Sequence, residues 1–125
     1  MTSNEILQGL SNFTGTTSYY RYSPLFPNMV LTDGTKYLAE AADAYWLMDA
    51  IASYLPKYRE QGFAVVKLSK FDHGWKLRIE DGNNGVLASQ VIEFSDFPLD
   101  TFTLYVAPQG MDNETVWVIM LTSEY

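Results

Sequence analysis

The sequence predicts an α+β protein in which N-terminal helices pack on one face of an antiparallel β-meander of about five strands. Apolar residues recur at helical spacing in the first half, and beyond Gly62 the apolar residues alternate with polar ones. Short turns rich in Gly and Asn separate the alternating segments, which favours antiparallel pairing. The 125 residues contain no repeat and no linker. We therefore expect one domain over 1–125, helical over about 1–61 and β over about 62–125.

The first helix is expected to begin at Thr2. Thr2 and Glu5 have the spacing of a capping box, in which each side chain accepts a hydrogen bond from the other residue's backbone amide. An apolar stripe follows at helical spacing, and Gly15 is a candidate for the end of the helix. Prolines and aromatic residues over 16–28 indicate an ordered loop, and 29–32 is compatible with a short strand.

The main helical segment is predicted over 36–54. Asp33 or Thr35 can cap its start, and a joint is expected near Asp43. Pro56 discourages continuation of the helix, because proline lacks the backbone donor that the helix interior needs.

The second half is predicted to contain five strands, because apolar and polar residues alternate in most of its segments. The expected strands are 63–70, 75–79, 86–94, 101–106 and 116–121. The last of them is apolar on both faces, so we place it centrally in the sheet. Asp81 to Gly85 is expected to form a tight hairpin turn.

The net charge of −7, from fifteen acidic and eight basic residues, argues against direct binding of nucleic acid and of anionic membranes. The N-terminal segment lacks the features of a signal peptide, and the chain contains no Cys. Both observations fit a cytoplasmic protein. No glycine-rich phosphate loop and no cluster of metal ligands is evident, so we expect neither a cofactor nor a metal ion.

Asp49 lies within a segment whose wide apolar face predicts burial on more than one side of the helix. A buried carboxylate must be hydrogen-bonded, paired or protonated. As a structural residue, Asp49 would accept hydrogen bonds from a backbone amide, a tyrosine hydroxyl or Arg21. As a functional residue, it would be a general acid or base whose pKa is raised by burial. We favour the structural interpretation, because spacing identifies no second catalytic group.

Two further segments carry candidate residues. Around Arg21 the chain reads TSYYRY, and aromatic residues beside an arginine can stack bases or bind an anion. The alternative is that the tyrosines pack on the sheet and Arg21 pairs with a carboxylate. His73, the single histidine, is expected to be a turn residue. If a pocket exists between helix and sheet, its candidate lining residues are Tyr20, Arg21, Tyr45, Trp46 and Asp49.

Several blocks of the sequence resemble those of a known group of proteins. The blocks are FTGT (13–16), YYR (19–21), LTDGTKYLAE (31–40), AYWLMDAIASY (44–54), DFPL (96–99), LYV (104–106) and LTSEY (121–125). In order and spacing they resemble a family of small uncharacterised proteins of bacteria and mobile elements, catalogued as a domain of unknown function. The resemblance implies no activity, substrate or catalytic residue. Members of the group often carry Gly at the position of Asp43, which is consistent with a joint there.

The leading hypothesis is a small, acidic, non-catalytic domain that acts through protein contacts, as an accessory protein of a mobile element. The nine tyrosines are suited to an interface, and a second copy of the chain could cover the second face of the sheet as a homodimer. One alternative is a ligand-binding or hydrolytic domain with a pocket around Asp49. Another is an acidic inhibitor that mimics nucleic acid.

Overall fold

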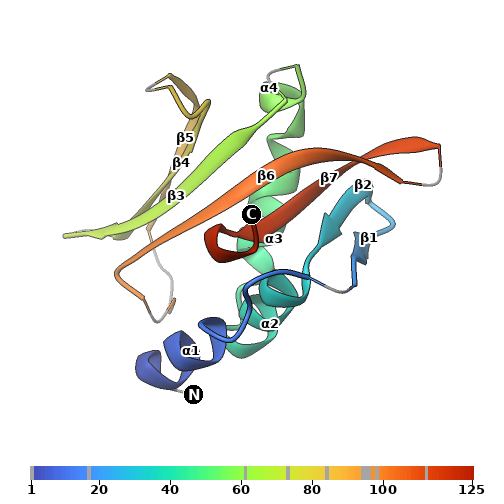
Figure 1. Cartoon of the computed structure of the whole chain (residues 1–125). Helices are drawn as coiled ribbons and strands as arrows, with labels where there is room; N and C mark the ends of the chain where they lie inside the picture. The colour runs from blue at the N-terminus through green and yellow to red at the C-terminus, as the bar shows by residue number, and fades with distance from the viewer. Residues whose placement is uncertain are drawn as a thin grey trace.

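The computed structural model describes residues 2–16, 18–60, 62–72, 74–83, 85–93, 97, 99–111 and 113–125. It confirms the α+β class: helices lie on one face of a seven-stranded sheet (Figure 1). The elements are α1 (Ser3–Leu10), β1 (Tyr20–Ser23), β2 (Phe26–Leu31), α2 (Asp33–Ala41), α3 (Tyr45–Ser53), α4 (Leu55–Tyr58), β3 (Ala64–Phe71), β4 (Gly74–Glu80), β5 (Val86–Ile92), β6 (Thr101–Met111), β7 (Glu114–Leu121) and a closing 3₁₀ turn, η1 (Thr122–Glu124).

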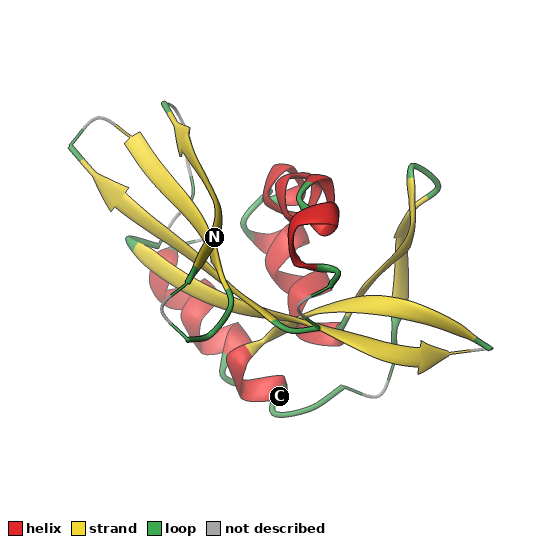
Figure 2. Cartoon of the chain, turned by 90° about the horizontal axis from the view of Figure 1, so that it is seen from above, coloured by secondary structure: helices red, strands yellow, loops and turns green. Residues whose placement is uncertain are grey.

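The strand order is β1-β2-β7-β6-β3-β4-β5. Strands β3, β4 and β5 form the expected meander, but β6 returns to the other side of β3 and forms a hairpin with β7. All neighbours are antiparallel except β2 and β7, which are parallel. Viewed from above, the strands fan out and cross in projection (Figure 2), as expected for a twisted sheet.

The prediction of about five antiparallel strands was therefore too low and missed the parallel pair. The segment predicted as a loop contains β1, and the short strand predicted at 29–32 begins earlier, at Phe26. Strand β1 has only four residues, Pro24 lies in the turn that follows it, and Pro27 lies within β2. Such a short strand presents too few alternating residues for its period to be recognised. The predicted central position of β7 is confirmed, because it lies between β2 and β6.

Local capping signals determine where α1 and α2 begin. The Thr2 hydroxyl accepts a hydrogen bond from the Glu5 amide over 3.2 Å, and the expected capping box is present. The cap of α2 is Thr32, and not Asp33 or Thr35. Thr35 is nevertheless the reciprocal partner, because its hydroxyl accepts a hydrogen bond from the Thr32 amide over 2.9 Å. Helix α1 ends before Gly15, at Leu10.

A joint at Asp43 separates α2 from α3, as predicted. Asp43 has a φ of 50°, in the left-handed region that glycine adopts at little cost. A fourth helix, the short α4, follows with Pro56 in its first turn, where the missing amide is not needed.

The main core lies between the helices and one face of the sheet. It contains Leu38, Leu47, Met48, Ile51 and Tyr58 from the helices, and Val66, Leu68, Leu77, Ile79, Leu104 and Ile119 from the strands. A smaller cluster on the opposite face contains Val30, Val116 and Val118, each at most 1% exposed. Both faces of β7 are therefore covered within one chain, and its apolar pattern does not require a second copy.

Candidate functional site

Asp49 is exposed to solvent on α3, so the expectation that it lies on a buried face is wrong. Its carboxylate accepts a hydrogen bond from the Tyr22 hydroxyl, which also lies 3.1 Å from the Tyr45 carbonyl oxygen. A tyrosine hydroxyl was one of the partners expected for a structural role. Burial and the bond to Asp49 raise the pKa of Tyr22 above its ordinary value. The contact ties β1 to the start of α3.

The aromatic candidates lie in separate contacts. The Tyr45 ring stacks on Tyr22 with 6.3 Å between centroids. Trp46 meets Phe97 edge to face at 6.2 Å, on the core side of the sheet. Tyr20 donates a hydrogen bond to Asp33 over 2.9 Å. These contacts account for the aromatic residues as packing around β1, α2 and α3.

Arg21 does not meet Asp49. In the antiparallel register Arg21 is opposite Val30, which places both residues on the face of the sheet away from the helices. The Arg21 guanidinium reaches across β2 and pairs with Glu114 at the start of β7. The alternative that Arg21 pairs with a carboxylate is thus correct, although the carboxylate is Glu114.

Neither of two grooves at the surface gathers the five candidates. One, of about 270 Å³, lies between β2 and the end of α3 and is lined by Phe26, Met29, Ala52 and Leu55 among others. The other, of about 330 Å³, lies between α1 and the start of β6. Asp49 lines neither groove, and a further groove of about 260 Å³ beside β1 is lined by Arg21 but by none of the other four candidates. In the described part of the chain, no three His, Asp or Glu side chains are grouped as metal ligands. His73 lies outside the described residues.

Sequence reasoning missed a polar site at the start of α2. The Glu124 carboxylate accepts hydrogen bonds from the Thr32 hydroxyl over 2.6 Å, the Gly34 amide over 3.0 Å and the Leu121 amide over 2.9 Å. A carboxylate at a helix N-terminus satisfies unpaired amides and is favoured by the helix dipole. The blocks LTDGT and LTSEY supply these residues, but nothing in the sequence pairs the two blocks. This arrangement explains both blocks as structural.

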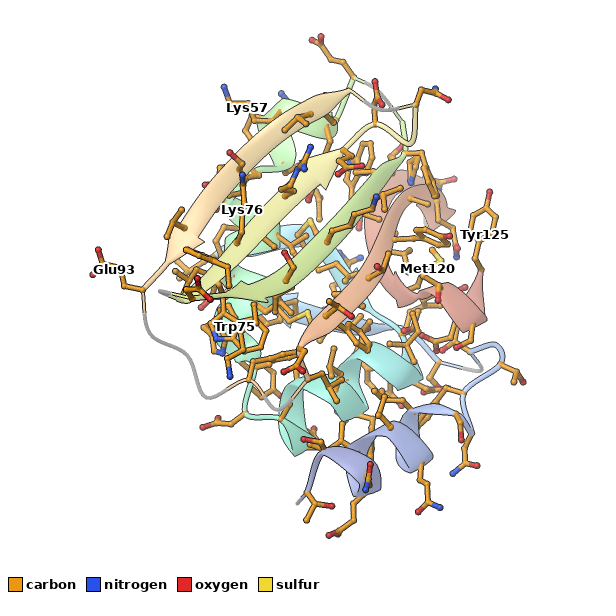
Figure 3. The ribbon with its side chains drawn as sticks, turned by 90° about the vertical axis from the view of Figure 1, so that its left-hand side faces the viewer. Lys57, Trp75, Lys76, Glu93, Met120 and Tyr125 are labelled. Carbon is orange, nitrogen blue, oxygen red and sulfur yellow. The ribbon has the colours of Figure 1, made fainter. Side chains whose placement is uncertain are left out.

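A second missed feature is the face of β3, β4 and β5 that the helices leave uncovered. We call it the open face and define it by Val65, Lys67, Ser69, Lys76, Arg78, Glu80, Ser89 and Val91, which share one side of the sheet in the observed register. Figure 3 looks onto these strands, with the helices behind them and Lys76 on the near side. Val91 is 57% exposed, and Lys67 and Lys76 are also exposed.

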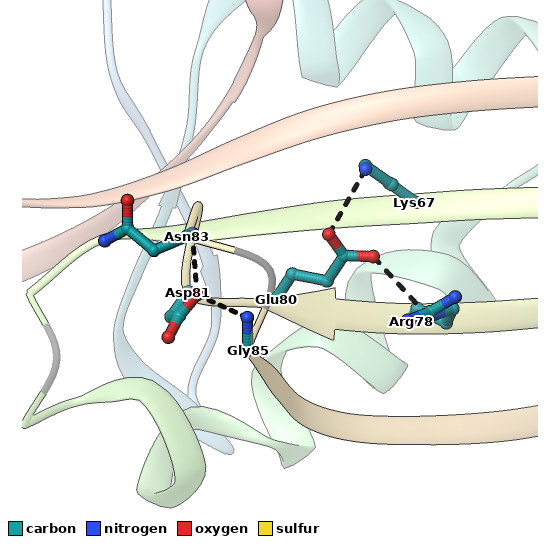
Figure 4. A network of polar contacts seen from close by, with 6 residues as sticks. All are labelled: Lys67, Arg78, Glu80, Asp81, Asn83 and Gly85. Atoms are coloured by element: carbon teal, nitrogen blue, oxygen red, sulfur yellow. Dashed lines mark hydrogen bonds and ion pairs between the residues drawn. The ribbon is translucent and has the colours of Figure 1, made fainter.

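Charge on the open face is arranged around Glu80, whose side chain is 12% exposed. The Glu80 carboxylate lies 3.2 Å from Lys67 Nζ and 3.5 Å from Arg78 Nε (Figure 4). Lys76, further along β4, makes no ion pair within the described residues. The face thus carries three positive charges and one negative charge.

The turn after Glu80 holds β4 and β5 in this arrangement. The Asp81 carboxylate accepts hydrogen bonds from the backbone amides of Asn83 and Gly85, over 2.7 and 2.9 Å (Figure 4). Gly82 has a φ of +86°, which glycine adopts without strain. The predicted tight hairpin turn is confirmed for the described residues, and Asn84 lies outside them.

Fold and surface together define a small α+β protein with one helix-covered sheet face and one partly open face. The chain belongs to a family of unknown function (DUF6876), whose model matches residues 4–125. This finding agrees with the resemblance in the sequence blocks. No curated protein and no solved structure matches the chain significantly. No described helix is both long enough and apolar enough to cross a membrane.

Proposed function

We propose that the protein is a non-catalytic interaction domain that binds an acidic protein segment through the open face. The supporting observation is the location of its positive charge. Three of the eight basic residues, Lys67, Lys76 and Arg78, project from two adjacent strands of a chain whose net charge is −7. Complementary charge accelerates association and selects among partners.

The geometry of the open face suits a protein segment. The face combines the three cations with small hydroxyl side chains on Ser69 and Ser89 and an apolar side chain on Val91. Glu80 forms ion pairs with both Lys67 and Arg78, which reduces the side-chain freedom that these two cations lose on binding. We include in this proposal an accessory role in a bacterial mobile element and a cytoplasmic location.

A decaglutamate peptide with a fluorescent label provides a defined probe of this proposal. We expect the anisotropy of the peptide to rise with added protein at 150 mM NaCl and to rise less at 500 mM, because exposed charges are screened. The triple variant Lys67→Gln, Lys76→Gln, Arg78→Gln should bind about 10- to 100-fold more weakly, at about 0.5–1 kcal/mol per removed exposed charge.

The matched control is the triple variant Lys36→Gln, Lys57→Gln, Arg59→Gln. It has the same net charge as the first triple variant and leaves the open face intact. It should bind within about threefold of the wild type. Lys76→Glu tests the face without disturbing the pairs of Glu80, and it should also weaken binding. An equal loss of peptide affinity in both triple variants would contradict the proposal. Tighter binding of a decathymidine oligonucleotide than of the peptide would also contradict it.

A further inference from the structure

The two edges of the sheet differ in how far they resist pairing with another strand. At one edge β1 is four residues long and is followed directly by Pro24 in its turn to β2. Short strands and prolines are features that protect an edge from pairing. At the other edge β5 has the sequence VLASQVI, seven residues without a charge, a proline or a glycine. Only the β1 edge therefore carries the usual protection.

The β5 edge is also accessible. Val86 is 48% exposed and Val91 is 57% exposed, and Ser89 and Gln90 are exposed between them. Strand β5 pairs with β4 on one side and is the last strand in the order of the sheet. Half of its backbone amide and carbonyl groups therefore face away from the sheet, where another strand can bond to them.

We propose that β5 of a second copy of this chain pairs antiparallel with this edge, with Ser89 opposite Ser89 of the second copy. In this register Ala88 is opposite Gln90 on either side of the central pair, whereas Val86 and Leu87 lie at the register shift of β5 and outside the regular pairing. The small Ser89 side chains thus meet at the centre and each Ala88 meets an uncharged Gln90, so the strand can pair with itself without a bulky or charged clash. The irregular register beside Glu80 lies at the end of β5 and leaves 88–92 regularly paired with β4.

The symmetry of this pairing explains why it stops at two copies. Opposite residues of an antiparallel pair share one face, so the dimer axis is perpendicular to the sheet and both open faces lie on the same side. The outer edges of the joined sheet are then two β1 strands, each of which is short and followed directly by Pro24. No further copy can add through β5, because both β5 edges are used.

The dimer also extends the open face. Lys67 is opposite Arg78, and Arg78 is opposite Ser89. Pairing at Ser89 therefore produces one row from Lys67 through Arg78 and both Ser89 residues to Arg78 and Lys67 of the second copy. At about 4.8 Å per strand, the two Arg78 backbones lie about 14 Å apart. This inference goes beyond the proposed function, because it concerns the edge of the sheet and does not require the acidic segment.

The lack of cysteine in the natural chain allows a direct test of the register. Residues directly opposite in an antiparallel pair have Cα atoms about 4.5–5.5 Å apart, within the range of a disulfide. We expect Ser89→Cys to form a covalent dimer on mild oxidation at 20 µM, as seen by non-reducing electrophoresis. Gln90→Cys, displaced by one residue, should remain monomeric in the same assay. Equal cross-linking of both variants, or of Gln90→Cys alone, would overturn the register.

Light scattering coupled to size exclusion tests the dimer without a disulfide. The wild type should be dimeric at 100 µM, and Ser89→Lys and Ser89→Glu should each be monomeric, because like charges would be directly opposite. An equimolar mixture of the two variants should form a heterodimer. A monomeric wild type, or a mixture that stays monomeric, would overturn the proposal. Peptide binding by the wild type, compared with the open-face triple variant, is a separate measurement and separates failure of the dimer from failure of the proposed function.

Discussion

The Glu124 carboxylate accepts a hydrogen bond from the Thr32 hydroxyl over 2.6 Å and thereby connects the end of β7 to the start of α2. The same carboxylate accepts from the amides of Gly34 and Leu121. Thr32 is 1% exposed, and in turn it accepts from the Thr35 amide. The parallel contact of β2 with β7 brings these residues together, since Thr32 directly follows β2 and Glu124 closely follows β7.

Removing the Glu124 carboxylate should destabilise the fold. Glu124→Ala leaves three donors without their acceptor, and we expect the free energy of unfolding to fall by about 2–3 kcal/mol. Glu124→Gln retains one acceptor oxygen and should lose about half as much. Urea unfolding followed by circular dichroism measures both changes. Glu60→Ala, at an exposed position, is the control and should change stability by less than about 0.5 kcal/mol.

Gly34→Ala should destabilise the protein although alanine favours helices. A Cβ atom at this position would lie 2.5 Å from Leu121 Cδ1 and 2.7 Å from Glu124 Oε1. The two side chains would have to move, and the cap on α2 would weaken. We expect a loss of about 1–2 kcal/mol, against a gain of about 1 kcal/mol at an unrestricted helical position. At Gly15 a Cβ atom would meet nothing within 4 Å, so Gly15→Ala should be nearly neutral. Thermal melts of the two variants measure both effects.

The effect of a substitution at Asp43 on stability should depend on how well the new residue tolerates the left-handed backbone conformation. Asp43→Gly removes the steric cost at a φ of 50°, and we expect a gain of about 0.5 kcal/mol after the added freedom of the unfolded chain is counted. Asp43→Ala should lose about 1 kcal/mol, because alanine tolerates this region less well than aspartate. A more stable alanine variant in chemical denaturation would contradict this explanation of the joint.

The protein should lose stability as the pH rises above about 10. Burial raises the pKa of Tyr58, and burial together with Asp49 raises that of Tyr22, whereas both ionise near 10 in an unfolded chain. Below pH 10 both neutral hydroxyls make their full contribution to the free energy of unfolding. Above pH 10 this contribution is lost, because the unfolded state releases protons that the folded state retains. Absorbance at 295 nm should show fewer ionised tyrosines in the folded protein at pH 11 than in urea.

Tyr58→Phe isolates one contribution to this alkaline dependence. It should lower stability at pH 7, because the hydroxyl of Tyr58 donates to the Ile51 carbonyl over 2.9 Å in the core. It should also make the fall in stability above pH 10 less steep. Tyr19→Phe, at an exposed position, should leave the slope unchanged. An identical slope in the wild type and Tyr58→Phe would contradict the role assigned to burial.

The exposure of Asp49 depends on how α3 docks on the sheet and does not follow from the sequence of the helix alone. The segment around it is apolar enough to predict burial on more than one side, yet Tyr45, Asp49 and Ser53 are exposed. The core uses the stripe that includes Leu47, Met48 and Ile51. Which of two adjoining stripes faces the sheet depends on how the helix docks, and that is set by contacts with distant strands.

The sequence by itself determined the features that depend on a few neighbouring residues. They include the capping box of α1, the joint at Asp43, the alternating strands β3 to β6 and the hairpin turn at Asp81. Only the tertiary structure decided the cap from Glu124, the parallel pairing of β2 with β7 and the face on which Arg21 lies. Local signals act through backbone geometry within one turn or hairpin. The long-range contacts join segments about 90 residues apart, and the packing of the whole sheet selects which of these segments pair.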